Sequence, residues 1–175
     1  YNVTDGGHDY NVAVGFQASL ALTTADQTVS VGGFALFDNT TGSGNTAIGY
    51  GSLGDNTTAD NNTAVGRNAM NLNTTATNGT AVGANALDAN TTGPNNSAFG
   101  RNALGANTTG GYNDAFGVSS LITATTGTNN AAFGHSSLHD LTTGTYNTGL
   151  GYAAGSAVTT GHYNIYIGGN AGASA

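Results

Sequence analysis

The chain has 175 residues and a formal net charge of −7, because nine Asp outnumber the two cationic side chains, Arg67 and Arg101. An acidic chain of this kind is repelled by nucleic acid phosphates and by anionic membrane surfaces, so we expect neither as a partner. The absence of Cys excludes disulfides and thiolate metal sites. No apolar run is long enough to span a bilayer, and we expect no membrane insertion.

An internal repeat of 17 residues organises the chain. Its most regular mark is a series of ten glycines without insertion or deletion: Gly15, Gly32, Gly49, Gly66, Gly83, Gly100, Gly117, Gly134, Gly151 and Gly168. Low charge with much Gly, Asn and Thr would otherwise predict disorder, but a repeat of constant phase is typical of a solenoid whose units make the same contacts with their neighbours. We divide the chain into a partial coil at 1–10 and one array at 11–175 that continues or stacks beyond both ends.

Each unit reads roughly N-T-A-V-G-x-N-A-L-x-x-N-T-T-G-x-x. Asn precedes the apolar segment in eight of ten units, and stacked Asn side chains can hydrogen-bond along a ladder. Ala stands two residues before the glycine in most units, and a large apolar residue stands directly before it. Neighbouring side chains in a strand point to opposite faces, so we predict a strand that is apolar on both. One face lines the inside of its own coil, and the other needs a partner.

The residue four positions after the glycine forms a second apolar column. Its members are Leu36, Leu53, Met70, Leu87, Leu104, Leu121 and Leu138, and it fails at Ser19, where Leu20 is displaced by one, and at Gly155 and Gly172. Burying one such side chain contributes about 1.5–3 kcal/mol, so two columns can support a core that no single unit could build. The glycine itself suits a left-handed backbone or a close approach where a Cβ would clash.

A pair of threonines follows in all nine complete units, from Thr23-Thr24 to Thr159-Thr160. We interpret it as a turn and the start of a second short strand. About 17 residues at about 3.3 Å each would accommodate two facing strands of about five or six residues. Helical periodicity is absent, and glycine is too frequent for helix interiors. We therefore predict an all-β fold, a β-solenoid or β-roll of about ten 17-residue coils and about 48 Å in length.

The segments Asn45–Gly49, Asn62–Gly66 and Asn96–Gly100 resemble the head repeats of trimeric autotransporter adhesins. They are also similar to repeats in phage tail-fibre proteins that end in a self-cleaving chaperone, and the stretch Asn164–Gly168 resembles what precedes that chaperone. The resemblance implies a β-roll, which we expect to be left-handed, and the association of three chains. It also implies an adhesive or receptor-facing role in a fibre on a cell or virion surface. The unit here is longer than the usual adhesin-head repeat.

The position after each glycine varies most, which marks freedom from packing. We take its larger members as candidate ligand-facing residues: Phe16, Tyr50, Arg67, Arg101, His135 and Tyr152. The sequon Asn-x-Ser/Thr recurs in one column, at Asn39, Asn56, Asn73, Asn90 and Asn107, which gives candidate glycosylation sites if a eukaryotic pathway processes the chain. Turn chemistry explains the same residues equally well.

Other constellations have plainer interpretations. His135 and His139 are four apart, but without a helix this spacing does not build a zinc site. Asp38, Asp55 and Asp140 share one column, which leaves open a carboxylate pair of glycosidase type beside the simpler reading as solvated turn residues. Turn Asp and Asn oxygens could bind Ca²⁺, although the calcium-binding nonapeptide motif is missing. We expect no catalytic residues and no cofactor.

Taken together, these features lead us to expect a non-enzymatic, extracellular fibre segment. Its partners would be two further copies of itself and a ligand on a host cell or in a matrix. Ends without caps would also allow subunits to stack into a filament. A third hypothesis is ice binding by the threonine columns, of which at most one can lie on the surface because adjacent strand residues alternate.

Overall fold

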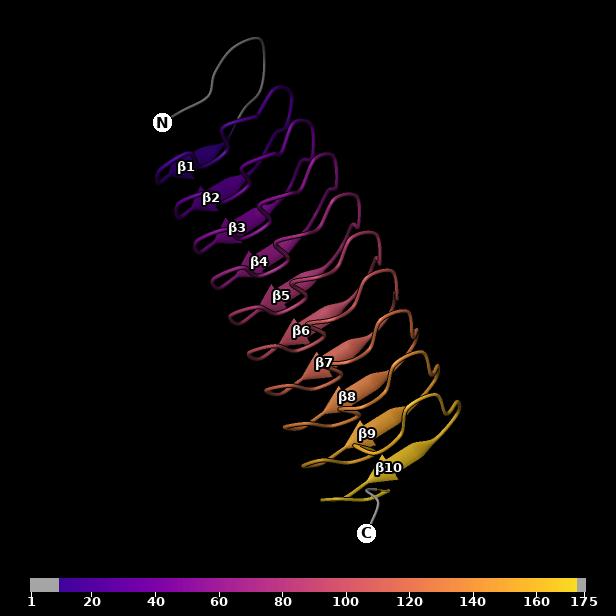
Figure 1. Ribbon diagram of the computed structural model, residues 1–175. Helices are drawn as coiled ribbons and strands as arrows, with labels where there is room; N and C mark the ends of the chain where they lie inside the picture. Colours follow the sequence, from indigo (N-terminus) through magenta and orange to yellow (C-terminus); the bar gives the residue numbers. More distant parts are fainter. Residues whose placement is uncertain (1–9, 173–175) are drawn as a thin grey trace.

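A computed structural model describes residues 10–172, so nearly all of the partial coil assigned to 1–10 lies outside the described residues. The described chain winds into a β-solenoid with one short strand in each coil (Figure 1). The strands are β1 Val12–Val14, β2 Val29–Val31, β3 Thr46–Ile48, β4 Thr63–Val65, β5 Thr80–Val82, β6 Ser97–Phe99, β7 Asp114–Phe116, β8 Ala131–Phe133, β9 Thr148–Leu150 and β10 Ile165–Ile167. They form a single parallel sheet in chain order, and every partner is 17 residues away, as Ala64 pairs with Ala81.

The glycine after each strand has no alternative residue. From Gly15 to Gly168 its φ lies between 112° and 140°, a conformation that L side chains rarely adopt. A Cβ on Gly66 would also lie 2.6 Å from the carbonyl carbon and oxygen of Gly83 in the next coil. Both reasons predicted from sequence, backbone conformation and close approach, therefore act at the same position.

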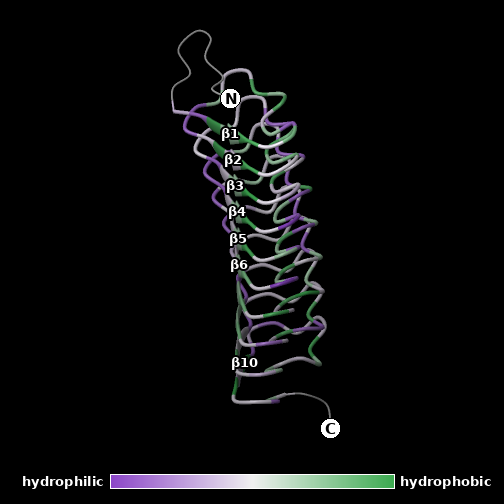
Figure 2. Ribbon diagram, turned by 90° about the vertical axis from the view of Figure 1, so that its left-hand side faces the viewer, coloured by the Kyte–Doolittle hydropathy of each residue, from purple (hydrophilic) through white to green (hydrophobic). Residues whose placement is uncertain are grey.

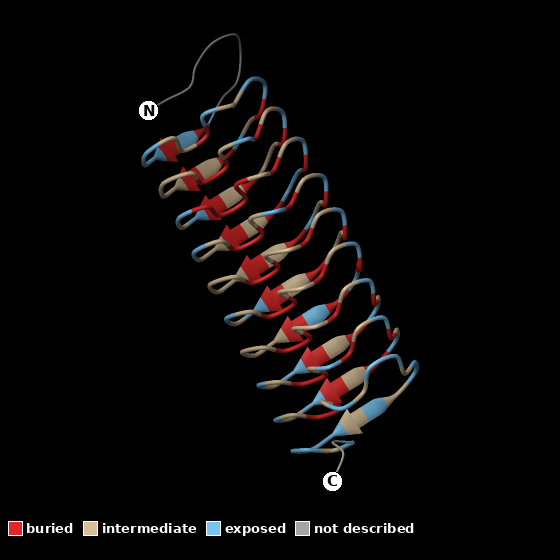
Figure 3. Ribbon diagram, in the orientation of Figure 1, coloured by how far each residue is buried: buried red, intermediate tan, exposed pale blue. Residues whose placement is uncertain are grey.

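The two faces of the strand divide as the alternation predicts. The middle residue of the strand points inward and is fully buried in Ala47, Ala64 and Ala81, while the large apolar residue that follows is on the outside. The second apolar column lies inside, because Leu36, Leu53, Met70, Leu87, Leu104, Leu121 and Leu138 are all fully buried. Figure 3 shows the buried positions recurring at the same place in successive coils. The core is therefore narrow and consists mainly of the Ala column packed against the Leu column.

The predicted second strand is wrong, and each strand has three residues rather than five or six. The residues two, four and twelve positions after the glycine have positive φ, as in Asn68 (55°), Met70 (50°) and Asn78 (59°). A left-handed residue ends an extended segment, so these three positions confine extended backbone to the strand. The rest of the coil is held by hydrogen bonds to the next coil, such as Leu36 N to Ser52 O at 3.0 Å and Thr40 N to Thr57 O at 2.9 Å.

Two interruptions of the Leu column have structural compensations. Ser19 contacts Ser30 with 2.8 Å between their Oγ atoms, and Leu20 points outward instead of replacing the missing core residue. In the last coils Tyr166 takes the inward strand position that Ala holds elsewhere. A Cβ on Gly155 would lie 2.7 Å from Tyr166 Cδ2, so the ring fills the space that a leucine would need.

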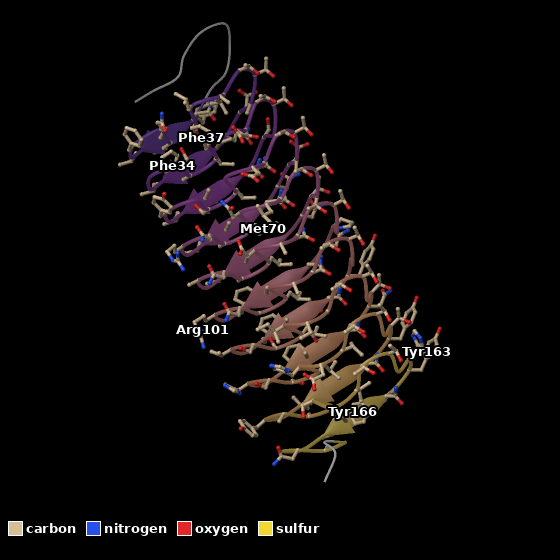
Figure 4. The ribbon with its side chains drawn as sticks, viewed as in Figure 1. Phe34, Phe37, Met70, Arg101, Tyr163 and Tyr166 are labelled. Carbon is tan, nitrogen blue, oxygen red and sulfur yellow. The ribbon has the colours of Figure 1, made fainter. Side chains whose placement is uncertain are left out.

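Figure 4 shows Tyr166 within the last coils and Tyr163 on their outer edge. Among residues 10–172, Tyr166 is partly buried against the interior of the final coils, while Ile165 and Ile167 on either side of it are exposed. Continuation of the array beyond both ends stays a prediction from the sequence.

Asn ladders line the interior at two positions. Asn precedes eight of the ten strands. Its Oδ1 accepts a backbone N–H from the next coil, as Asn62 N donates to Asn45 Oδ1 at 2.9 Å, and its Nδ2 donates to a carbonyl almost one circuit ahead, as Asn45 does to Ala59 O at 2.7 Å. The ladder predicted from sequence is thus confirmed.

The second ladder comprises Asn39, Asn56, Asn73, Asn90 and Asn107. In it the Nδ2 of each later Asn donates to the Oδ1 of the one before, at 2.8–3.2 Å. The ladder ends at Asn107, because Ala124 occupies the next position, and Asn107 Oδ1 is buried without a hydrogen-bond partner.

Candidate functional site

An exposed apolar column runs the length of the solenoid. We call it the outer strand column. It consists of Val14, Val31, Ile48, Val65, Val82, Phe99, Phe116, Phe133, Leu150 and Ile167, one per strand. Six of these residues are among the exposed large hydrophobic side chains, from Phe99 at 36% to Ile167 at 67%. Figure 2 shows the strands that carry them in one file along one side of the molecule.

The middle of the outer strand column is aromatic. The Phe116 ring is stacked between those of Phe99 and Phe133, with centroids 4.7 and 4.9 Å away and the planes within 8° of parallel. The Ala column lies on the inner face of the sheet, which packs on the core of the coil. Stacking within the chain covers only part of the large apolar side chains on the other face, and their outer surface stays exposed to solvent.

The six candidate ligand-facing residues lie where the sequence placed them. Phe16, Tyr50, Arg67, Arg101, His135 and Tyr152 are all exposed. Figure 4 shows Arg101 on the outer edge of its coil. His135 and Tyr152 follow one another in adjacent coils, with their rings stacked at 5.5 Å. Their exposure makes them accessible and assigns them no ligand.

The structure brings Tyr50 together with residues that the sequence analysis did not single out. Phe34 lies at the centre of an aromatic cluster, with its ring 5.4 Å from that of Phe16 and 5.5 Å from those of Phe37 and Tyr50. Phe34 and Phe37 are labelled near the N-terminal end of the solenoid in Figure 4. Phe34 and Phe37 are half-buried, whereas Tyr50 is 58% exposed.

An open hollow of about 270 Å³ lies beside this cluster. We call it the aromatic hollow. It is lined by Phe34, Phe37, Tyr50, Gly51, Gly54, Asp55, Asn68 and Asn71. The signal was present in the sequence: the unit that begins at Gly49 is the only one in the array with glycine both two and five positions after its repeat glycine. Only the fold shows that these two positions lie under the Asn71 amide, whose Nδ2 donates to Gly51 O at 2.7 Å.

Of the three Asp residues that share one repeat position, Asp38, Asp55 and Asp140, only the first two lie close together. Burial raises the pKa of Asp55, and the charge of Asp38 one coil away raises it further. Asp140 belongs to a coil far along the array and has its own partner, with His139 Nδ1 2.6 Å from its Oδ1. Asp55 therefore lines the aromatic hollow with Asp38 close enough to act on its charge, and Asp140 is separate.

The three histidines among residues 10–172 do not lie together. His135 Nδ1 contacts Ser136 Oγ at 3.0 Å, whereas His139 contacts Asp140. His162 Nδ1 is 2.8 Å from Thr145 Oγ1 in the preceding coil. In residues 10–172 no three His, Asp or other ligating side chains are grouped closely enough to hold a metal ion.

The two threonine columns differ in environment. The hydroxyl of the first Thr donates to the backbone carbonyl of the equivalent Thr in the next coil, as Thr91 Oγ1 does to Thr108 O at 3.0 Å. The second Thr is exposed in every unit: Thr24, Thr41, Thr58, Thr75, Thr92, Thr109, Thr126, Thr143 and Thr160. One threonine column thus lies on the surface, and the other serves the structure.

The five sequon asparagines form the second internal ladder. Each is fully buried, and its Nδ2, the atom that would carry a glycan, donates a hydrogen bond inside the coil. The folded coil leaves no room for a glycan at these positions. Turn and ladder chemistry accounts for the recurrence of the Asn.

Comparisons with known proteins add no relative. No protein-family model matches the sequence, and no match was found among the curated proteins or the solved structures. No helix occurs among residues 10–172, and none of that segment could therefore cross a membrane as a helix.

Proposed function

We propose that this chain is a non-enzymatic structural and adhesive segment of an extracellular fibre, in which three left-handed β-solenoids associate side by side. The outer strand column carries the proposal. It is continuous, lies on one flank, and repeats at the same spacing as the coils, so an identical chain presents a matching surface in register. The resemblance of Asn45–Gly49 and Asn62–Gly66 to adhesin-head and tail-fibre repeats supports the same assembly.

The energetics are of the right size for such an assembly. Covering the half-exposed part of one Val, Ile, Leu or Phe contributes about 1 kcal/mol, so ten residues contribute about 10 kcal/mol per chain. Association costs roughly 4–15 kcal/mol in lost rigid-body freedom and side-chain order. Assembly therefore needs most of the column, and a charge placed in the middle of it should abolish assembly.

Sedimentation equilibrium at micromolar concentration tests the proposal. The expected mass is three times that of one chain, and Phe116→Asp is expected to reduce it to that of a monomer. Tyr112→Asp is the matched control, because Tyr112 is 61% exposed but does not belong to the outer strand column. A wild-type protein that sediments as a monomer contradicts the proposal, as does a Phe116→Asp variant that remains trimeric.

Two other hypotheses have weaker support. Ice binding would rest on the single exposed threonine column from Thr24 to Thr160, and thermal hysteresis of the purified protein tests it. Stacking into filaments would rest on the last described strand, β10, where Ile165 and Ile167 are exposed and Tyr166 is partly buried. Concentration-dependent growth of rods in light scattering would favour it.

A further inference from the structure

The aromatic hollow is a recess of the described array that combines three aromatic side chains, Phe34, Phe37 and Tyr50, with the amides of Asn68 and Asn71. Glycine at positions 51 and 54 removes two side chains that neighbouring coils retain. A Cβ on Gly54 would lie 2.6 Å from Asn71 Nδ2, and one on Gly51 would lie 2.9 Å from Asn68 Oδ1. The two glycines therefore allow both amides to lie close over the floor of the recess.

The aromatic wall is held in place by its neighbours. Tyr50 packs over Gly33, where a Cβ would be 3.5 Å from Tyr50 Cδ2, and its ring meets the Phe34 ring edge to face. Phe34 in turn contacts Phe16 and Phe37. A large ring fixed on two sides and 58% exposed offers a preformed apolar surface to a ligand.

The opposite wall is polar and lacks a cation. The amides of Asn68 and Asn71 offer both donors and acceptors, and Asp55 offers acceptors. A sugar ring matches this arrangement, because one of its faces consists of C–H groups and its rim consists of hydroxyls that both donate and accept. Asp38 and Asp55 would repel a phosphate, a sulfate or a carboxylate on the ligand.

We propose that the aromatic hollow binds a single neutral sugar residue of a cell-surface glycan, with the sugar's apolar face on Tyr50 and its hydroxyls at Asn68, Asn71 and Asp55. The proposal rests on the adhesive function proposed above and names its ligand class. The volume of about 270 Å³ lies just below the roughly 300 Å³ at which pockets for drug-sized ligands begin, which favours one sugar unit over an oligosaccharide. Three copies in one fibre would increase weak binding through multivalency.

The chain provides an internal comparison. A second hollow of about 280 Å³ lies in the same columns, lined by Asn85, Asp88, Asn102, Gly105, Ala106 and Ile122. It has the amides, the carboxylate and the glycine, but no aromatic ring. If the aromatic wall is essential, this second hollow binds no sugar.

A glycan array bearing neutral hexose and N-acetylhexosamine termini beside sialylated and sulfated glycans tests the proposal with the full chain. We expect neutral glycans alone to bind. Tyr50→Ala should weaken binding of the responding glycan about tenfold, and Asn68→Ala should weaken it as well. Tyr152→Ala is the control, since Tyr152 occupies the same repeat position with 61% exposure but lies outside the hollow. Circular dichroism and thermal unfolding check that each variant is folded.

Each result separates this inference from the assembly proposed above. Binding confined to acidic glycans, no binding at all, or equal loss in Tyr50→Ala and Tyr152→Ala would each overturn the sugar site, whatever the sedimentation mass. A monomeric protein that still binds neutral glycans through Tyr50 retains the sugar site and refutes the trimer. A trimer that binds no glycan retains the proposed assembly and refutes the sugar site.

Discussion

Met70 and Gly79 are complementary in size. Met70 stands where other coils have Leu, and Gly79 stands where most have the ladder Asn. A Cβ on Gly79 would lie 2.6 Å from Met70 Cε and 3.3 Å from its Sδ, so the longer side chain occupies the space that the missing Asn leaves. Two departures from the repeat therefore form one packing unit.

This pairing predicts a strong coupling between the two positions. Gly79→Asn alone should destabilise the protein by about 1–3 kcal/mol, because the new side chain overlaps the Met70 methyl. Met70→Leu alone should cost less than about 1.5 kcal/mol. The double variant should recover at least the wild-type stability, since it restores the Leu and Asn of the neighbouring coils. Urea unfolding of the four proteins measures the coupling, and additive effects would refute the pairing.

The internal Asn ladder should respond according to position. Asn73→Ala leaves Asn56 Oδ1 without its donor at 3.0 Å, and we expect a loss of about 2–3 kcal/mol. Asn107→Ala should cost about 1 kcal/mol less, because Asn107 Oδ1 is already buried without a partner. Thermal unfolding measures the stability of both variants. Equal losses of stability would contradict a smaller contribution from Asn107 at the end of the ladder.

The repeat glycines should tolerate no side chain. Gly66→Ala combines a φ of +138° with a Cβ 2.6 Å from Gly83 backbone atoms, so we expect a loss of at least about 3 kcal/mol or no folded protein. Gly33→Ala is the control, because its Cβ would meet nothing nearer than Tyr50 Cδ2 at 3.5 Å and Ala84 holds the same repeat position. It should be near neutral by circular dichroism and thermal unfolding. A stable Gly66→Ala protein would contradict the close approach.

Stability should increase on mild acidification. Burial raises the pKa of both Asp55 and Asp88; Asp38 adds to the effect at Asp55, and Arg67 offsets part of it at Asp88. A carboxyl group whose pKa is higher in the folded chain holds its proton more tightly there. Its favourable contribution is therefore full below the unfolded pKa of about 3.9 and is lost as the pH rises through the folded pKa.

The melting temperature is accordingly expected to rise between pH 7 and about pH 4. Asp55→Asn should raise it at pH 7 and flatten the dependence, and adding Asp88→Asn should flatten it further. A wild-type melting temperature that does not rise over this interval, or one that rises equally in the double variant, would contradict this role of the two carboxyl groups.

Much of the fold could be predicted from the sequence, because the same 17-residue pattern recurs along the chain and each repeat forms the same coil. The unbroken spacing from Gly15 to Gly168 fixed the register, and the Ala64-Val65 alternation predicted one buried and one exposed apolar face. The same local pattern gave no reason to expect left-handed residues such as Asn68 and Met70, which shorten the strands to three residues. Residues with positive φ other than Gly are set by the closure of the coil rather than by local preference.

The sequence of one repeat by itself determines the path of the coil, because equivalent residues of successive repeats make the same contacts with one another. What only the tertiary structure decided lies where units differ. Tyr166 fills the place of the missing leucines, Met70 fills that of the Asn missing at Gly79, and Phe34 joins Tyr50 beside a recess over Gly51 and Gly54. These residues are separated along the chain, and only the stacking of successive coils brings their side chains within contact distance.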